Sequence, residues 1–212
     1  MKPDLSRCVA AAIALSVSAP AGAQHIPLPA ALYGTMEVKS ESSTAGGNLT
    51  GCSLAYRTLI RDWIHRQGQA SIVIGKFGVA LNEAGVAQGH LKVVVSDLSP
   101  GDKDLVATPN RPRSIYLTSE GHNTLKARIS QRETDPAGAL SAVFELDAQF
   151  LGIIEDVLNT ERVNVMFARE KNGQDVPVEL ELKVTGTDEG LQRVRSSVEL
   201  EAFAKCLARL LS

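Results

Sequence analysis

Residues 70–98 read ASIVIGKFGVAL, then NEAG, then VAQGHLKVVVSDL, and this stretch decides how the chain folds. Two runs rich in β-branched residues, Ala70 to Leu81 and Val86 to Leu98, flank the four residues 82–85. β-Branched side chains favour strands, and the flanked segment supplies the Asn and Gly that a short turn requires. The stretch therefore predicts a β-hairpin.

A second hairpin is predicted further along the chain. Arg162 to Ala168 and Val176 to Thr185 alternate as half-buried strands do, and the turn-rich residues 171–175 join them. Shorter strands are predicted around these two hairpins, at Ser114 to Thr118, Leu125 to Gln131 and Leu140 to Asp147.

Three segments carry apolar residues at helical spacing. The first is Ser53 to Gln67, in which Trp63 shares the apolar stripe and Gly68 follows the last turn. The second is Ala148 to Asn159. The third runs to Leu211 and is preceded by Ser196 and Glu199 at capping-box spacing. The predicted fold class is α+β, with antiparallel hairpins and three amphipathic helices.

The order helix then hairpin thus occurs twice, and residues 59–64 align with residues 153–158 without a gap. Two explanations stay open. The chain contains an inherited duplication, or it contains two unrelated amphipathic helices of the same kind.

The N-terminal segment predicts export. Met1 to Ala23 combines a charged start, an apolar run from Cys8 to Val17 and a small-residue site ending at Ala23, as a cleaved signal peptide does. Gln24 to Asn48 is polar and rich in turn residues, which predicts a flexible leader. Residues 49–212 then form a single domain, and we expect a periplasmic or secreted location.

Only Cys52 and Cys206 remain after the predicted cleavage. In an oxidising compartment two cysteines favour a disulfide, and the alternative is a pair of buried free thiols. A bridge would tie the first predicted helix to the last. Closing so long a loop constrains the unfolded chain by roughly 5 kcal/mol in the entropy model.

Charge excludes some classes of partner. The chain has 22 basic and 24 acidic residues, a net charge of -2, and no basic cluster, so nucleic acid is not an expected partner. Past the signal no apolar run approaches the ~20 residues that span a bilayer. We expect a protein that does not span the membrane and is a monomer or a weak oligomer.

The sequence offers little chemistry. Residues 51–55 differ from the nucleophile elbow Gly-x-Ser-x-Gly at the last position only, but no core strand is predicted before them, so a plain helix start is favoured for Ser53. No catalytic, cofactor or metal site is predicted from the histidines, which are His25, His65, His90 and His122. Four carboxylates are interpreted as surface charges, namely Asp62, Glu145, Asp156 and Glu181.

One loop is a candidate contact surface. Ser99 to Arg113 contains three prolines, and Arg111 and Arg113 lie on either side of the last of them. Such a loop is typical of the protein surface, and the two arginines are candidate contacts for an acidic partner. Strand edges are a second candidate, because an exposed edge accepts a strand from another chain. Val176 to Thr185 and Ala70 to Leu81 are the predicted docking strands.

The last third of the chain resembles the invasion-associated locus B proteins, which are small exported bacterial proteins. The resemblance lies in the order of four elements, namely the helix from Ile153, the strand from Val163 to Phe167, the strand from Val176 to Val184, and the closing helix with Ala202 to Leu207. It implies an envelope protein that acts through contacts.

We therefore expect an exported, non-enzymatic envelope protein that serves as an interaction or adaptor module for another envelope protein. The alternative is a periplasmic hydrolase or small-ligand carrier built around Ser53 or the histidines.

Overall fold

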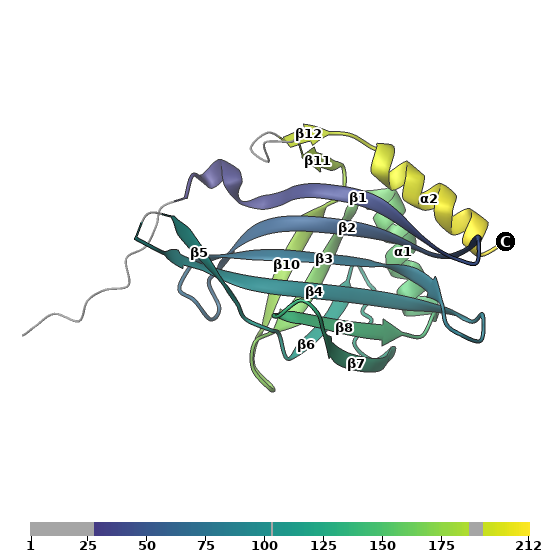
Figure 1. The fold of residues 1–212 in the computed structure, drawn as a ribbon, viewed down its shortest axis with the longest axis horizontal. Coiled ribbons are helices and arrows are strands. Elements are labelled where there is room, and N and C mark those ends of the chain that lie inside the picture. The colour runs from purple at the N-terminus through teal and green to yellow at the C-terminus, as the bar shows by residue number, and fades with distance from the viewer. Residues whose placement is uncertain (1–27, 103, 187–192) are drawn as a thin grey trace, which may run out of the picture.

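The computed structural model describes residues 28–102, 104–186 and 193–212 (Figure 1). Strands make up 55% of the described residues and helices 16%. The molecule is therefore mostly β, and the prediction of an α+β fold with three helices is wrong. The predicted signal, Met1 to Ala23, lies outside the described residues.

Seven antiparallel strands form a large sheet in the order β1-β2-β3-β4-β8-β7, with β5 attached to β4. The predicted hairpin of residues 70–98 is confirmed as β3 and β4, at the centre of this sheet. The strands are β1 (Gly34–Ala45), β2 (Asn48–Asp62), β3 (Gln69–Leu81), β4 (Ala87–Pro100), β5 (Leu105–Pro109), β7 (Arg128–Thr134) and β8 (Ala139–Phe144).

A second sheet of three strands, in the order β10-β9-β6, crosses behind the large sheet (Figure 1). It contains β6 (Ser114–Thr118), β9 (Arg162–Ala168) and β10 (Asp175–Glu181). The second predicted hairpin is thus confirmed, although its second strand ends early and continues as β11 (Val184–Gly186), which pairs with β12 (Arg193–Arg195). The main core lies between the two sheets. Its largest fully buried side chains include Phe77, Phe144, Phe150, Phe167 and Phe203.

Side chains join the two sheets where their edges meet. At one seam the side-chain amide of Gln131 on β7 accepts a hydrogen bond from Ile115 N and donates one to Arg113 O. It thus makes the two hydrogen bonds to β6 that the backbone of an adjacent strand would make. At the other seam Thr35 Oγ1 on β1 accepts a hydrogen bond from Glu181 N on β10 at 2.8 Å. The two sheets therefore enclose the core as a flattened, nearly closed barrel.

Two of the three predicted helices are confirmed. In α1 (Ala148–Thr160) the Asp147 carboxylate caps the first turn by accepting from Gln149 N and Phe150 N. In α2 (Val198–Leu210) the predicted capping box is wrong, because Glu199 instead accepts a hydrogen bond from Ser40 N on β1. A short 3₁₀ turn, η1 (Ala30–Leu32), precedes β1. No helix in the described part of the chain is long and apolar enough to cross a membrane.

The first predicted helix is wrong, because its residues belong to β2 and to the turn that follows. Leu54 and Tyr56 face the main core, whereas Leu59 packs on the opposite face with Ala70 and Leu98. A strand buried on both faces loses its strict alternation, so its apolar residues can also match a helical spacing. With this helix absent, helix then hairpin occurs once in the described chain, and the basis for a duplication is gone.

Three further expectations for this half of the chain are wrong. Residues of the predicted flexible leader form β1, which pairs with β2 along its whole length. Trp63 is 67% exposed in the β2–β3 turn and is not a core residue. Asp62, expected at the surface, is fully buried.

Candidate functional site

The strand β5 is the most exposed strand of the large sheet. It pairs with β4 on one side, and among the described residues no strand pairs with its other side. All five residues are exposed, and two of them are large and apolar, Leu105 at 40% and Val106 at 49%. β5 lies within the segment predicted as a loop, residues 99–113, so the sequence interpretation missed it.

The hydrogen-bond pattern shows which backbone groups of β5 are free. Gly101 N donates to Asp104 O, and Asn110 N donates to Val95 O, which fixes the phase of the ladder on either side of β5. Because facing pairs alternate along an antiparallel ladder, Val106 and Thr108 turn their N–H and C=O groups toward β4. Leu105 and Ala107 therefore turn theirs outward.

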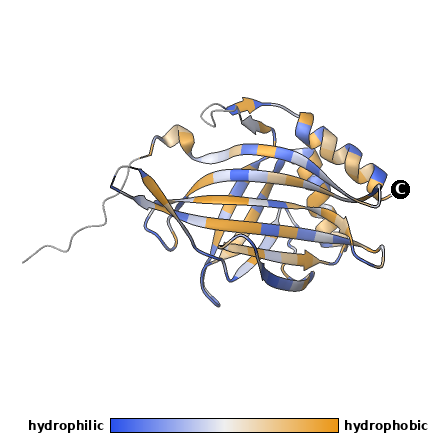
Figure 2. Cartoon of the chain, in the orientation of Figure 1, coloured by the Kyte–Doolittle hydropathy of each residue, from blue (hydrophilic) through white to orange (hydrophobic). Residues whose placement is uncertain are grey.

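Charge distinguishes β5 from the other edges. At the end of the sheet, β7 carries Arg128, Arg132 and Glu133, and charges of this kind discourage strand addition. β5 carries no charged residue. Figure 2 shows the contrast, with blue along β7 and orange at the start of β5.

The two docking strands predicted from the sequence have different outcomes. Ala70 to Leu81 lies in β3, which pairs with β2 on one side and with β4 on the other, so that prediction is wrong. Val176 to Thr185 contains β10, an edge strand whose outer side is bonded to β1 through Thr35. β5 is the better candidate, because both of its faces and its outer edge are open.

The predicted contact residues Arg111 and Arg113 follow β5 directly. The guanidinium of Arg111 pairs with Glu133 on β7 at 2.6 Å, so its charge is already balanced. The backbone of Arg113 is fixed by Arg113 N donating to Ala168 O and by Arg113 O accepting from Gln131. Its side chain is exposed and forms no ion pair with any residue that the structure describes.

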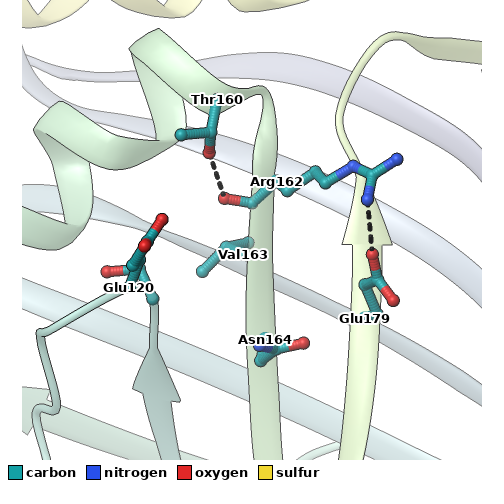
Figure 3. A pocket seen from close by; sticks show the side chains of 7 residues that line it. Glu120, Thr160, Arg162, Val163, Asn164 and Glu179 are labelled. Carbon is teal, nitrogen blue, oxygen red and sulfur yellow. Dashed lines mark hydrogen bonds and ion pairs between the residues drawn. The ribbon is translucent and has the colours of Figure 1, made fainter.

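A polar cleft of about 360 Å³ opens at the end of α1 (Figure 3). Arg162 on β9 pairs with Glu179 on β10 at 3.1 Å across its rim, and Thr160 Oγ1 donates to the Asp156 carbonyl at 2.8 Å and lies 3.4 Å from the Arg162 carbonyl. Both members of the ion pair are more than half exposed, so the pair contributes little to stability. The cleft is lined by Ser119, Glu120, Thr160, Arg162, Val163, Asn164 and Glu179.

Beside this cleft a serine, an aspartate and a histidine meet. Ser119 Oγ donates to Asp156 Oδ2 at 2.6 Å, and His122 Nδ1 lies 3.0 Å from the same oxygen. Hydrogen bonds from Ser119, which has the larger effect, and from His122 hold the pKa of Asp156 below its ordinary value. A nucleophilic serine must instead give its proton to the histidine. This arrangement stabilises a carboxylate and does not activate Ser119.

Ser53 and His90, the residues of the hydrolase alternative, lie on neighbouring positions of one sheet face. Ser53 on β2 and His90 on β4 both pair in register with Gly78 on β3. The described structure contains no hydrogen bond between them, and Ser53 lies within a strand, not at a strand-to-helix turn. Burial is the main reason that the pKa of His90 is lowered to about 4, and the positive charge of Lys76 adds to this effect.

The sequence interpretation missed a buried ionic cluster that joins the two sheets. Arg169, after β9, contacts Asp62 at 2.6 Å and Asp97 at 2.8 Å, and Ser71 Oγ donates to Asp97. Burial alone would raise the pKa of Asp97, but hydrogen bonds from Asn110, Ser71 and Arg169 outweigh it and hold the pKa below its ordinary value. The cluster joins β2, β3 and β4 of the large sheet to the end of β9.

The predicted disulfide between Cys52 and Cys206 is present, with a Cα–Cα distance of 5.8 Å. It ties strand β2 to helix α2, not one helix to another, because the segment around Cys52 is a strand. Among the described residues no group of three or more His, Cys, Asp or Glu side chains is arranged to hold a metal ion.

Comparison with known proteins gives no relative for this chain, since no family model, curated protein or solved structure matches it. The resemblance to the invasion-associated locus B proteins therefore stays a prediction.

Proposed function

We propose that this protein is an exported, non-enzymatic envelope protein that binds another envelope protein by accepting a strand along β5. The observation that carries the proposal is the open edge of β5, which combines outward backbone groups at Leu105 and Ala107 with an uncharged, partly apolar strand. Backbone hydrogen bonds supply affinity in strand addition, and side-chain contacts supply specificity. Arg113, exposed next to this edge, is positioned to contact an acidic residue of the partner.

Site-specific photocrosslinking tests the docking strand. A crosslinking amino acid replaces Leu105 on β5 in one variant and Ile129 on β7 in another, and both are exposed apolar positions on edge strands of the same sheet. In the periplasm of the source cell we expect a discrete crosslinked species from position 105 and none from position 129. Equal crosslinking from both positions would contradict the proposal.

Ala107→Pro sharpens the test. Proline removes the outward N–H at position 107, whereas Val106 and Thr108 keep their bonds to β4, and proline is tolerated at sheet edges. We expect the crosslink from position 105 to fall at least tenfold while the thermal midpoint changes by only a few degrees. Ile129→Lys on β7 is the matched control and should leave the crosslink unchanged.

The location is tested separately. We propose cleavage after Ala23, so N-terminal sequencing of the protein recovered from the periplasm of a Gram-negative host should begin at Gln24. Recovery of an uncleaved, cytoplasmic protein would overturn the export proposal and leave the test of β5 intact.

A further inference from the structure

The outer face of the large sheet is turned away from the three-stranded sheet and toward the viewer in Figure 1. Facing residues of adjacent strands lie on the same side of a sheet, so the register places side chains in transverse rows. One row, here called the basic row, crosses the six strands from β1 to β7 through Lys39, Ala55, Lys76, Lys92, Ser141 and Arg132. It lies on the outer face, because the chain neighbours Leu54, Phe77 and Leu91 point into the main core. The basic row holds four cations and no carboxylate, although the sequence shows no basic cluster.

Two lysines of the basic row face each other directly. Lys76 on β3 pairs in register with Lys92 on β4, and like charges directly opposite each other destabilise a sheet. His90, in the adjacent row, responds to the same field, since the charge of Lys76 adds to burial in lowering its pKa. A local feature that costs stability without a gain in packing is typical of a functional surface.

Carboxylates balance the charge of this face only in part. The two rows that flank the basic row add Arg57, Glu37 and Glu41, so the three rows together hold five cations and two carboxylates. Glu37 lies 2.6 Å from Lys39 and 3.9 Å from Arg57, and Glu41 lies 3.1 Å from Lys76. Both carboxylates are on β1, so they act at one end of the basic row.

The other end of the basic row has no such balance. Lys92 donates a hydrogen bond to the backbone carbonyl of Asp135, and Arg132 is exposed. Within the described part of the chain neither Lys92 nor Arg132 forms an ion pair. The uncompensated positive charge is therefore concentrated from β4 to β7.

Small residues lie between the cations and leave room along the row. A pocket of about 210 Å³ opens at the β1 end, and its lining includes Ala55 and Gly75 together with Lys39 and Arg57. The side chains of Lys39 and Arg57 are 66% and 51% exposed. Ser141 separates Lys92 from Arg132 at the other end. An extended chain laid across the strands can therefore reach each cation from above.

The shape and chemistry of the basic row favour a linear anionic polysaccharide. Adjacent strands lie about 4.8 Å apart, so the row is roughly 24 Å long, which suits an extended chain with repeated charges. A membrane surface would require large apolar side chains among the cations, and the basic row contains none larger than alanine. Single-stranded nucleic acid would require rings for base stacking, and the three rows contain no Phe, Tyr or Trp. The hydroxyl groups of Ser130 and Ser141 suit the hydroxyl groups of a sugar.

We propose that the basic row binds a linear polysaccharide that carries carboxylate groups and lies across the strands of the large sheet. Lys92 and Arg132 pair with carboxylates along the chain, and Lys76 and Lys39 extend the contact toward β1. This site is independent of the strand-docking function proposed for β5, which pairs with the other end of β4.

Titration of the folded, oxidised protein with three probes tests the proposal. The probes are a short oligogalacturonate, which has a carboxylate on every sugar, a neutral dextran oligomer, and vesicles of anionic phospholipid. We expect oligogalacturonate to bind at least tenfold more tightly than dextran, with amide chemical shifts concentrated at positions 76, 92, 132 and 141. Binding should be lost in about 1 M salt, where charges are screened within about 3 Å. Failure of oligogalacturonate to saturate, binding equal to that of dextran, or binding to the vesicles alone would each overturn the proposal.

Variants of equal charge locate the site. Lys92→Gln combined with Arg132→Gln should weaken oligogalacturonate binding at least tenfold. Lys171→Gln combined with Lys205→Gln removes two exposed cations outside the three rows and should leave binding within twofold. Equal losses in the two double variants would show that only net charge matters and would contradict the assignment, as would unchanged binding in the first.

A charge-conserving variant and the β5 variant complete the test. Lys92→Arg combined with Arg132→Lys keeps both charges and should keep binding within threefold. Ala107→Pro should not affect oligogalacturonate binding, and the Lys92→Gln and Arg132→Gln pair should not affect the crosslink from position 105, so the two proposals fail separately.

Discussion

At the scale of single residues, the Asp62–Arg169 pair is the most deeply buried ion pair in the described structure. Asp62 is fully buried and Arg169 is 7% exposed at its side chain, and Asp62 Oδ1 also accepts hydrogen bonds from Ile64 N and His65 N. Removing one partner of a buried pair leaves an uncompensated charge, which costs far more than the pair contributes.

Asp62→Asn should therefore lower the free energy of unfolding by about 3 to 5 kcal/mol. Urea denaturation at pH 7 measures it. Arg162→Gln, which removes a similar but exposed ion pair with Glu179, should cost less than about 1 kcal/mol. Equal effects of the two variants would show that burial does not govern the Asp62–Arg169 pair.

His90 makes stability depend on pH. Its pKa is about 4 in the folded protein and 6.5 in an unperturbed chain, so between these values the unfolded state binds the extra proton. Stability therefore falls as pH drops from 6.5 to 4, by up to about 3 kcal/mol, and this contribution is constant above that window. His90→Gln should reduce the loss measured by urea denaturation between pH 7 and pH 4. An unchanged pH profile would contradict the assignment.

At the scale of elements, prediction succeeded where one face of an element is buried and failed where both faces are buried, as in β2, or neither face is, as in β5. Helix α1, helix α2 and strand β9 follow clear periods of 3.6 or 2 residues, and their positions could be predicted. β2 carries apolar residues on both faces, and its outer face is buried by η1 and its neighbours. This burial is a tertiary contact, which no local sequence pattern reveals. β5 was missed because its five residues lie among prolines in a segment with loop composition.

The β2–β3 turn depends on a glycine for two reasons. Gly68 has a φ of +83°, and a Cβ there would lie 2.6 Å from ring atoms of Trp63. Gly85, in the β3–β4 turn, has a φ of +76° but open space around it.

Gly85→Ala should therefore cost about 1 to 2 kcal/mol from backbone strain alone. Gly68→Ala should cost up to about 1 kcal/mol more, because the exposed Trp63 ring must move to another side-chain torsion. Urea denaturation gives both values, and Trp63 is the single tryptophan, so its fluorescence should change in Gly68→Ala only. Equal costs for the two variants would contradict the contact between Trp63 and Gly68.

At the scale of the whole molecule, the disulfide between Cys52 and Cys206 was predicted correctly. The elements that it joins were not, because Cys52 lies in strand β2 and not in a helix. Only two cysteines follow the predicted signal segment, which left one pairing, whereas the elements that carry them could not be predicted once β2 was taken for a helix. The candidate surfaces fared similarly. Arg113 lies at the surface as expected, whereas β5 was missed even though it pairs with the preceding strand β4, because the composition of its segment is that of a loop.

Replacing Cys52 and Cys206 together with alanine should lower the free energy of unfolding by about 5 kcal/mol, since the bond closes a loop with a sequence separation of 154 residues. Urea denaturation of the oxidised protein and of the double variant measures the difference. A loss below about 1 kcal/mol would show that the unfolded chain is not constrained as the entropy model assumes.

The same bond decides how the molecule resists mechanical force. Because it links Cys52 to Cys206, tension applied at the two chain ends bypasses every residue between them and stretches only the short tails outside this covalent ring. In a single-molecule pulling experiment, β1, the start of β2 and the last residues of α2 would extend while the strands between Cys52 and Cys206 stay folded, and reducing agent would release the remaining contour length at about 3.5 Å per residue.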